Sequence, residues 1–227
     1  MLRLFRGLIP PPDLRVPGLK IYLRPPADSD FPQWVELRQK SRDFLVPWEP
    51  TWPRDALTRG SWRRRLRHYG EEWHEGTSYS FLLFRNSDDA LLGGITLSNV
   101  RRGVAQTGTI GYWVGASYAR QGVMTQGVEL MLRFAFHDLG LHRVEAACLP
   151  VNTASRGLLT KCGFRQEGYA PQYLKINGIW EDHVLFAMLS WEVPSRLTAQ
   201  ACPASAESVD NPTPSLASAL SHLVPRS

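Results

Sequence analysis

The sequence predicts an α/β (α+β) fold: a mixed central sheet of about seven strands, with flanking helices and a C-terminal hairpin. Two observations lead to this expectation. Short segments in which apolar and polar residues alternate, as in strands, are interspersed with longer segments whose apolar residues recur at helical spacing. Near the C-terminus, two long strand-like segments flank Asn177-Gly178, a dipeptide typical of a tight hairpin turn. Helices placed between strands in this way cover the faces of one sheet.

The first half of the chain predicts one strand, two helices and a strand pair. LKIYLR (19–24) alternates as a strand does. ADSDFPQWVELRQKSRDFL (27–45) begins with polar capping residues and spaces its apolar residues as a helix does, and a second helix is expected over 55–74. SYSFLLFRN (78–86) and ALLGGITLSNV (90–100) are predicted strands, and the short polar SDD between them indicates a hairpin.

The second half alternates strands with helices before the final hairpin. The predicted order is a strand TIGYWVG (109–115), a helix over 123–139, a strand HRVEAACLPV (142–151), a helix TASRGLLTKCG (153–163) and two hairpin strands over 164–176 and 179–189. Gly163 closes the second of these helices, as expected of a glycine in the left-handed conformation after a helix end.

These elements place one domain at residues 19–192, a size in keeping with a chain of 227 residues. Residues 1–18 contain IPPPDLRVPG, which is too proline-rich for regular structure, so an extended arm is expected there. Residues 193–227 are rich in Ser, Ala and Pro without a sustained apolar period, which predicts a disordered tail.

The sequence also limits the cellular setting. No apolar run reaches the roughly 18 residues of a membrane span, and the N-terminus lacks the apolar centre of a signal peptide. Cys148, Cys162 and Cys202 form no Cys-x-x-Cys pair, and the six histidines share no metal-ligand spacing. We therefore expect a cytoplasmic protein with no disulfide framework, no metal, and neither a membrane nor a DNA partner.

The net charge of +5 leaves two interpretations of the basic residues open. The densest run is RGSWRRRLRH (59–68). Such a run is compatible with the solvated face of a helix, and equally with a surface that attracts RNA or an acidic partner. No RNA-binding signature accompanies it, so the solvated face is the preferred interpretation.

ARQGVMTQG (119–127) is a candidate phosphate-binding segment between a strand and a helix. It contains neither a P-loop nor a dinucleotide-binding glycine pattern. A helix that starts near residue 123 leaves its first amides without intrahelical acceptors, and the helix dipole and Arg120 add positive potential there. The amides in question belong to Gln121, Gly122, Val123, Met124 and Thr125. These residues suit a pyrophosphate, although an ordinary strand–helix connection would look similar.

A second segment, PVNTASRGLLTKCGF (150–164), points to one family. Together with the loop it resembles the GNAT family of acetyl-CoA-dependent N-acetyltransferases, whose pyrophosphate loop reads [QR]-x-x-G-x-[GA] and whose following motif opens a helix with Asn and closes it with Gly-Phe. Asn152, Gly163 and Phe164 match that motif, and Gly122 matches the loop. Ala119 and Met124 depart from the first and last loop positions, which affects a side-chain contact but not the amide cradle.

Further stretches resemble the ribosomal-protein alanine N-acetyltransferase (RimJ/RimL) branch of that family. They are FLVPWEP (44–50), LSNVRRG (97–103) and LLTKCGFRQEGYAPQYLKINGIWEDHVL (158–185). The resemblance covers roughly residues 19–190. It implies a strongly twisted sheet, acetyl-CoA as co-substrate, and as acceptor the N-terminal α-amino group of a protein, in the first instance the N-terminal alanine of a ribosomal protein.

The resemblance also assigns roles to individual residues. The strand that contains Val114 would present backbone amides to the pantetheine arm. Many members carry a tyrosine seven residues after the motif Asn, as the acid toward the CoA thiolate, but this chain has Leu159 there. In the RimJ/RimL branch the role falls at the position of Ser155. Asn152 would contact pantetheine, although both Asn152 and Ser155 would also serve as ordinary helix-capping residues.

The general base is the least defined part of the site. An α-amino group titrates near 7.7–8.0, so a sizeable fraction is neutral without a strong base. Glu145 is a candidate because it alternates to the same strand face as Ala147, where some relatives carry a glutamate. Glu49, in PWEP, is the second candidate; it would line the acceptor mouth or bind the incoming amino group. Either glutamate could instead be a surface or ion-paired carboxylate, and Tyr173 and Trp180 would either shape the acceptor slot or belong to the core.

Three functions remain in competition on sequence grounds. The leading one is acetylation of a protein N-terminus, with the ribosome as a possible site of association. The second is the same chemistry on a small amine or antibiotic. The third, from a different class, is a ribosome- or RNA-associated binding protein in which catalysis is secondary, as the 59–68 run would suggest.

Overall fold

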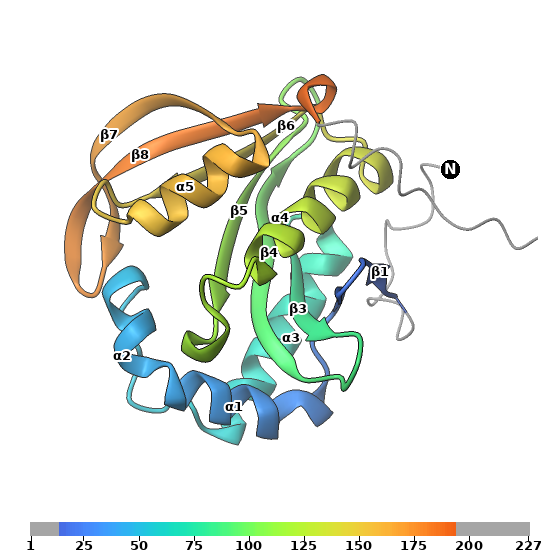
Figure 1. The fold of residues 1–227 in the computed structure, drawn as a ribbon, viewed down its shortest axis with the longest axis vertical. Helices are drawn as coiled ribbons and strands as arrows, with labels where there is room; N and C mark the ends of the chain where they lie inside the picture. The colour runs from blue at the N-terminus through green and yellow to red at the C-terminus, as the bar shows by residue number, and fades with distance from the viewer. Residues whose placement is uncertain (1–13, 194–227) are drawn as a thin grey trace, which may run out of the picture.

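The computed structural model describes residues 14–193, which form a single sheet with helices on both faces (Figure 1). The strand order is β1-β2-β3-β4-β5-β6-β8-β7, and every neighbouring pair is antiparallel except β5 and β6, which are parallel. The strands are β1 (Val16–Pro17), β2 (Ile21–Arg24), β3 (Tyr79–Arg85), β4 (Leu91–Arg101), β5 (Thr107–Val114), β6 (Arg143–Cys148), β7 (Arg165–Ile176) and β8 (Ile179–Leu189). The predicted mixed α/β fold with a C-terminal hairpin is confirmed, with one strand more than the seven expected.

The additional strand, β1, lies in the segment expected to be an irregular arm. Val16 and Pro17 pair with Leu23 and Tyr22 of β2. Proline is tolerated because β1 is an edge strand. On its outer side the backbone N–H groups face no other strand, so the N–H that proline lacks breaks no hydrogen bond of the sheet. Residues 1–13 of the expected arm, and the expected tail from residue 194 onward, lie outside the described part of the chain.

The helices follow the predicted segments, with shifted boundaries. They are α1 (Phe31–Lys40), α2 (Arg42–Leu45), α3 (Arg59–Glu75), α4 (Val123–Arg133) and α5 (Thr153–Cys162). The single helix expected over 27–45 is interrupted at Ser41, whose hydroxyl accepts a hydrogen bond from the Ala116 amide at 2.9 Å. The helix expected from residue 55 begins at Arg59 because Thr58 caps it, accepting from the Ser61 amide at 3.2 Å.

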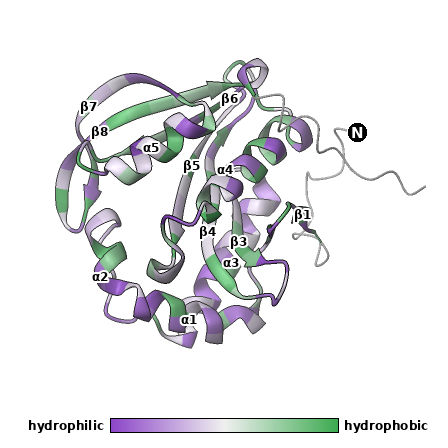
Figure 2. Ribbon diagram, viewed as in Figure 1, coloured by the Kyte–Doolittle hydropathy of each residue, from purple (hydrophilic) through white to green (hydrophobic). Residues whose placement is uncertain are grey.

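Two hydrophobic clusters pack the opposite faces of the sheet. The larger one joins α4 and α5 to the strands, and the smaller one packs α1 and α3 residues such as Trp34 and Trp62 against β2, β3 and β4. Hydrophobic residues are concentrated on the strands, whereas α1 and α3 carry many hydrophilic residues (Figure 2). No helix within residues 14–193 is long and apolar enough to cross a membrane.

The parallel pair β5–β6 opens after a short contact. Thr107, Gly108 and Thr109 pair with Arg143, Val144 and Glu145, and no further register is formed between these strands in the described structure. β6 then pairs along its whole length with β8, while β5 stays on β4. The two halves of the sheet therefore diverge, and the β6-facing backbone edge of residues 110–114 has no strand partner.

Candidate active site

The N-terminus of α4 provides a cluster of unpaired backbone donors. Gly122, which precedes the helix, has φ = 74°, and the first hydrogen bond of the helix runs from the Gln126 amide to the Gly122 carbonyl at 3.2 Å. The amides of Val123, Met124 and Thr125 therefore come before the helical ladder and have no acceptor in the helix. A side-chain carbon added at Gly122 would meet nothing within 4 Å. An open approach, free amides and the helix dipole suit an anion such as a pyrophosphate.

The flanking residues of the loop add little to this cradle. Arg120 also has a positive φ, of 62°, and the Gln121 side chain turns back to donate to the Ser117 carbonyl at 2.7 Å. Within the predicted pyrophosphate site, the free donors therefore belong to the backbone at the start of α4. Val114, at the end of β5, pairs with Gly93 of β4 on the side away from β6.

Ser155 lies between the two strands that diverge. Asn152 caps α5 by accepting from the Ser155 amide at 3.0 Å, which fixes the first turn of the helix. The Ser155 hydroxyl lies 2.8 Å from the hydroxyl of Tyr112 on β5. This contact connects β5 to the helix that follows β6, so it borders the opening between them.

Cys148, the last residue of β6, completes this group of side chains. Its buried thiol neighbours Ser155, and burial raises the pKa of Cys148 although the Ser155 hydrogen bond lowers it. Burial also raises the pKa of the Tyr112 hydroxyl well above its usual value, so this phenol stays neutral. Tyr112 was not singled out from the sequence. The available signal was strand alternation, which places Tyr112 on the same face as Val114.

Leu159 has a purely structural environment. It is 0% exposed and belongs to the larger hydrophobic cluster. Residues Ser155, Leu159 and Cys162 lie along one side of α5, three or four residues apart, and Cys162 is also fully buried. The helix therefore presents Ser155 at its N-terminal end and packing residues behind it.

Glu49 forms an ion pair with Arg38 next to the turn of the β7–β8 hairpin. Both carboxylate oxygens bond to Arg38 of α1, at 2.7 and 2.5 Å, and Trp52 Nε1 donates to Oε2 at 2.7 Å. The Arg38 guanidinium stacks over the rings of Trp52 and Trp113, 4.2 and 4.8 Å from their centroids. The Glu49 backbone carbonyl accepts from the Asn177 amide at the hairpin turn, at 2.9 Å. Glu49 thus connects α1, β5 and the hairpin.

Glu145 lies on β6 and is also ion-paired. Its carboxylate accepts from Arg143 Nε at 2.8 Å, and Arg143 binds Glu167 of β7 through its other nitrogens. Burial alternates along β6, with Val144, Ala146 and Cys148 inside, so Glu145 and Ala147 share the other face as expected. Neither glutamate contacts Ser155 or Tyr112.

Large apolar side chains stay exposed on α2, on the turn after it and on the β7–β8 hairpin, and together they are called the apolar rim. In Figure 1 the tip of the β7–β8 hairpin lies beside α2, and the Asn177 amide bonds to the carbonyl of Glu49 in the segment that follows α2. The rim consists of large side chains that remain exposed: Phe44, Trp48, Tyr173, Leu174, Ile179 and Trp180. Tyr173 and Trp180 are 48% and 58% exposed, so they do not belong to the core.

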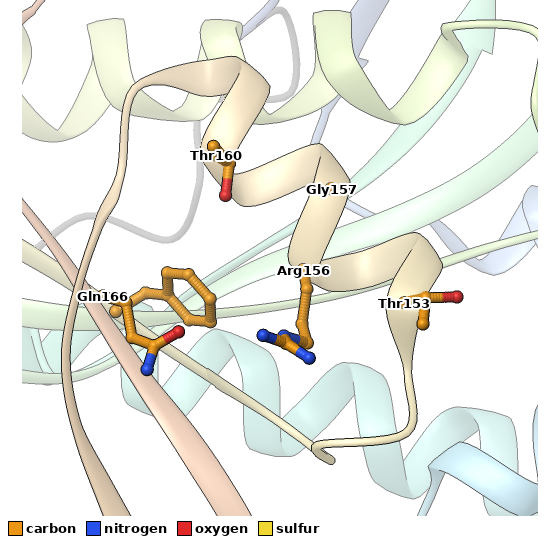
Figure 3. Close-up of a pocket in the computed structure, with 6 residues that line it drawn as sticks. Thr153, Arg156, Gly157, Thr160 and Gln166 are labelled. Carbon is orange, nitrogen blue, oxygen red and sulfur yellow. The ribbon is translucent and has the colours of Figure 1, made fainter.

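A separate shallow hollow of about 300 Å³ lies on the other side of α5 (Figure 3). Thr153, Arg156, Gly157 and Thr160 line it from the helix, and Gln166 and Phe186 line it from the hairpin strands. None of the predicted site residues lines this hollow. Within residues 14–193, no group of three or more His, Cys, Asp or Glu side chains could hold a metal ion.

Four of the five arginines of α3 are engaged in local contacts. Arg59 and Arg63 pair with Asp28, and Arg64 pairs with Asp55. Arg65 stacks over Trp34, 5.8 Å from its ring centroid. These contacts hold α3 to the segments that precede it, in keeping with the solvated-face interpretation of the 59–68 run.

Free helix-start amides, near a β5 edge that has no strand partner, suit a cofactor that carries a pyrophosphate. Residues 20–165 match the Acetyltransferase (GNAT) domain family, and the chain belongs to that family. It is an acetyl-CoA-dependent N-acetyltransferase.

Relatives with known names cover most of the chain. The probable N-acetyltransferase YjcK of Bacillus subtilis (strain 168) is 38% identical over 76% of this chain and 96% of its own. The [ribosomal protein uS5]-alanine N-acetyltransferase of Escherichia coli (strain K12) is 32% identical over 78% of this chain and 91% of its own. The structure of Mycobacterium smegmatis RimJ in complex with CoA-disulfide superimposes with a TM-score of 0.74 at 33% identity, over 79% of this chain and 88% of that one.

Proposed function

We propose that the protein transfers the acetyl group of acetyl-CoA to the N-terminal α-amino group of another protein, in the first instance the N-terminal alanine of a ribosomal protein. The observation that carries the acceptor class is the exposed apolar rim. Six large apolar side chains from α2, the turn after it and the hairpin stay in contact with solvent, which suits contact with a polypeptide better than with a small polar amine. The uS5-alanine enzyme, 32% identical over 177 residues, supports the same acceptor.

In this proposal the backbone binds the co-substrate. The amides of residues 121–125 hold the pyrophosphate, with Arg120 close by, and the unpaired edge of β5 up to Val114 binds the pantetheine arm and polarises the thioester carbonyl. Asn152 orients the first turn of α5 and contacts the same arm. Free donors and an open approach at Gly122 are the features that fit this ligand.

The chemistry is direct attack of the neutral amine. A nitrogen–carbon bond forms, the carbon–sulfur bond breaks, and its electron pair leaves with the CoA sulfur. Ser155 donates a hydrogen bond to that departing thiolate, and the proton of the amine passes to solvent or to a carboxylate. Glu49 and Glu145 remain the two proposed carboxylates, although arginines engage both.

The test is transfer of labelled acetyl groups to a panel of acceptors. Peptides that begin with Ala, Ser or Met are compared with an Ala peptide whose N-terminus is blocked, and with polyamines. Acetylation of free Ala peptides, with none on the blocked peptide, is expected. Trp180→Ser should raise KM for the peptide and leave KM for acetyl-CoA unchanged. Efficient transfer to polyamines with no transfer to peptides would show instead that the acceptor is a small amine.

The cellular form of the test is intact-mass measurement of ribosomal proteins with and without this enzyme. One protein should be lighter by a single acetyl group when the enzyme is missing. A cytoplasmic location belongs to the same proposal, since ribosomal proteins and acetyl-CoA meet there. RNA binding without catalysis is disfavoured because four of the five α3 arginines contact Asp28, Asp55 and Trp34. Salt-sensitive RNA binding together with no acetyl transfer would reverse that judgement.

A further inference from the structure

We propose that Tyr112 is a positioning residue for the acetyl transfer, which holds the Ser155 hydroxyl so that its proton faces the departing CoA sulfur. The inference rests on the proposed role of Ser155. It assigns the phenol of β5 a function that the family's sequence motifs do not contain. The geometric basis is the 2.8 Å contact between the Tyr112 hydroxyl and Ser155 Oγ.

The direction of this hydrogen bond follows from the available partners. Within residues 14–193 the Tyr112 hydroxyl has Ser155 as its single hydrogen-bond partner. An enclosed phenol satisfies its proton by donating it, and a serine hydroxyl accepts with its lone pairs while keeping one proton of its own. With Tyr112 as donor, the Ser155 proton is left for a third group.

A buried thiol lies next to Ser155. Cys148 neighbours Ser155, and the Ser155 hydrogen bond favours the thiolate form of Cys148. A CoA sulfur in the β5–β6 opening would receive the same donor, because Tyr112 and Ser155 stand on the two elements that border the opening.

The energetic consequence is pre-organisation of a weak donor. A serine hydroxyl on its own rotates among several directions, and only one of them points at the leaving sulfur. Fixing that direction before the reaction removes reorganisation from the chemical step. Burial raises the pKa of Tyr112, so the phenol keeps its proton, and with it the donor role, at neutral and mildly alkaline pH.

The experiment is a double-mutant cycle on the full chain with Tyr112→Phe, Ser155→Ala and both together. Tyr112→Phe should lower kcat about tenfold, the effect of one neutral hydrogen bond, and leave KM for acetyl-CoA unchanged. Ser155→Ala should lower kcat about 100-fold. In the Ser155→Ala background, Tyr112→Phe should cost nothing further, because the hydroxyl it positions is gone.

Tyr22→Phe is the matched control. It removes another hydroxyl of the same sheet, that of Tyr22 on β2, which donates to Asp89 Oδ1 at 2.7 Å. This change should leave kcat unchanged. A wild-type kcat for Tyr112→Phe, or an additional tenfold loss in the Ser155→Ala background, would overturn the proposal. Equal losses for Tyr22→Phe and Tyr112→Phe would also overturn it, since they would indicate a general effect on stability.

A second readout needs no acceptor. CoA itself is bound to each variant and its thiol is titrated by the ultraviolet absorption of the thiolate. The pKa of the bound thiol should rise in Tyr112→Phe and in Ser155→Ala, and stay at the wild-type value in Tyr22→Phe. If the wild-type protein acetylates no acceptor, the proposed function fails, and this titration still decides the role of Tyr112: an unchanged thiol pKa in Tyr112→Phe refutes it.

Discussion

Glu49 is the residue through which α1 and the turn of the hairpin meet. Its carboxylate binds the two terminal nitrogens of Arg38, whose guanidinium stacks over the rings of Trp52 and Trp113, and its carbonyl accepts from the Asn177 amide at the hairpin turn. A buried guanidinium without its carboxylate is costly, because the charge is left desolvated and unpaired. The geometry therefore gives Glu49 a share in stability in addition to its proposed place at the acceptor mouth.

Replacing this carboxylate should destabilise the fold. We expect Glu49→Gln to lower the free energy of unfolding by about 2 kcal/mol, less than for a fully buried pair because the Glu49 side chain is 20% exposed. Urea denaturation measures the change. Glu36→Gln is the control, since Glu36 forms an exposed pair with Lys40 and should show no measurable effect. Equal stabilities of Glu49→Gln and wild type would contradict the expectation.

The engaged state of Glu145 leads to a kinetic prediction. Because Arg143 holds its carboxylate, we expect the neutral amine to attack without help from Glu145, and Glu145→Gln to keep kcat within a few-fold of wild type. A general base would contribute 10²–10⁴-fold. The rate should rise with pH until the acceptor amine is neutral, near 7.7–8.0, in both proteins. A loss of 100-fold in Glu145→Gln would establish Glu145 as the base.

At the scale of elements, the start of α4 is the proposed binding site of the CoA pyrophosphate. Gly122→Ala should weaken CoA binding about tenfold, because an alanine is strained at φ = 74° and relief of that strain shifts the free amides that follow it. Gly103→Ala is a close control. Gly103 also has a positive φ, of 65°, and nothing within 4 Å of an added carbon, but it lies in the β4–β5 turn. Both should lose about 1 kcal/mol of stability from backbone strain, and calorimetry should find weaker CoA binding only for Gly122→Ala. Equal CoA affinities of Gly122→Ala and Gly103→Ala would contradict the proposal that the amides at the start of α4 bind the pyrophosphate.

Local patterns account for most of these elements, and contacts distant in sequence account for the rest. The hairpin and α5 were predictable because Asn177-Gly178, Asn152 and Gly163 act on their nearest neighbours. The interruption at Ser41 was not, since its cause is the amide of Ala116, 75 residues away. The same holds for Tyr112, whose partner Ser155 is 43 residues away. Local motifs identified the predicted site residues, but they did not identify distant side chains such as Tyr112 that contact those residues.

The strand order separates the two halves of the sheet. β6 pairs with β8 while β5 stays on β4, so the sheet divides where the short parallel contact ends. α4 and α5 pack on the same side through the larger hydrophobic cluster, and the hairpin reaches back to Glu49. The separation of β5 from β6 is therefore a consequence of the strand order.

The boundary of the folded unit is the last testable property at this scale. Sequence analysis placed it at residue 19, but Val16 is 5% exposed in the core, and the Arg133 side chain donates to the Pro17 carbonyl at 2.9 Å. A chain of residues 19–193 should therefore unfold with a free energy about 2–3 kcal/mol below that of residues 14–193, the cost of losing one buried valine and its pairing. Leu19→Ala, at a position 80% exposed, should change nothing. Equal stabilities of the two chains in urea would show that β1 is dispensable, and would return the boundary to residue 19.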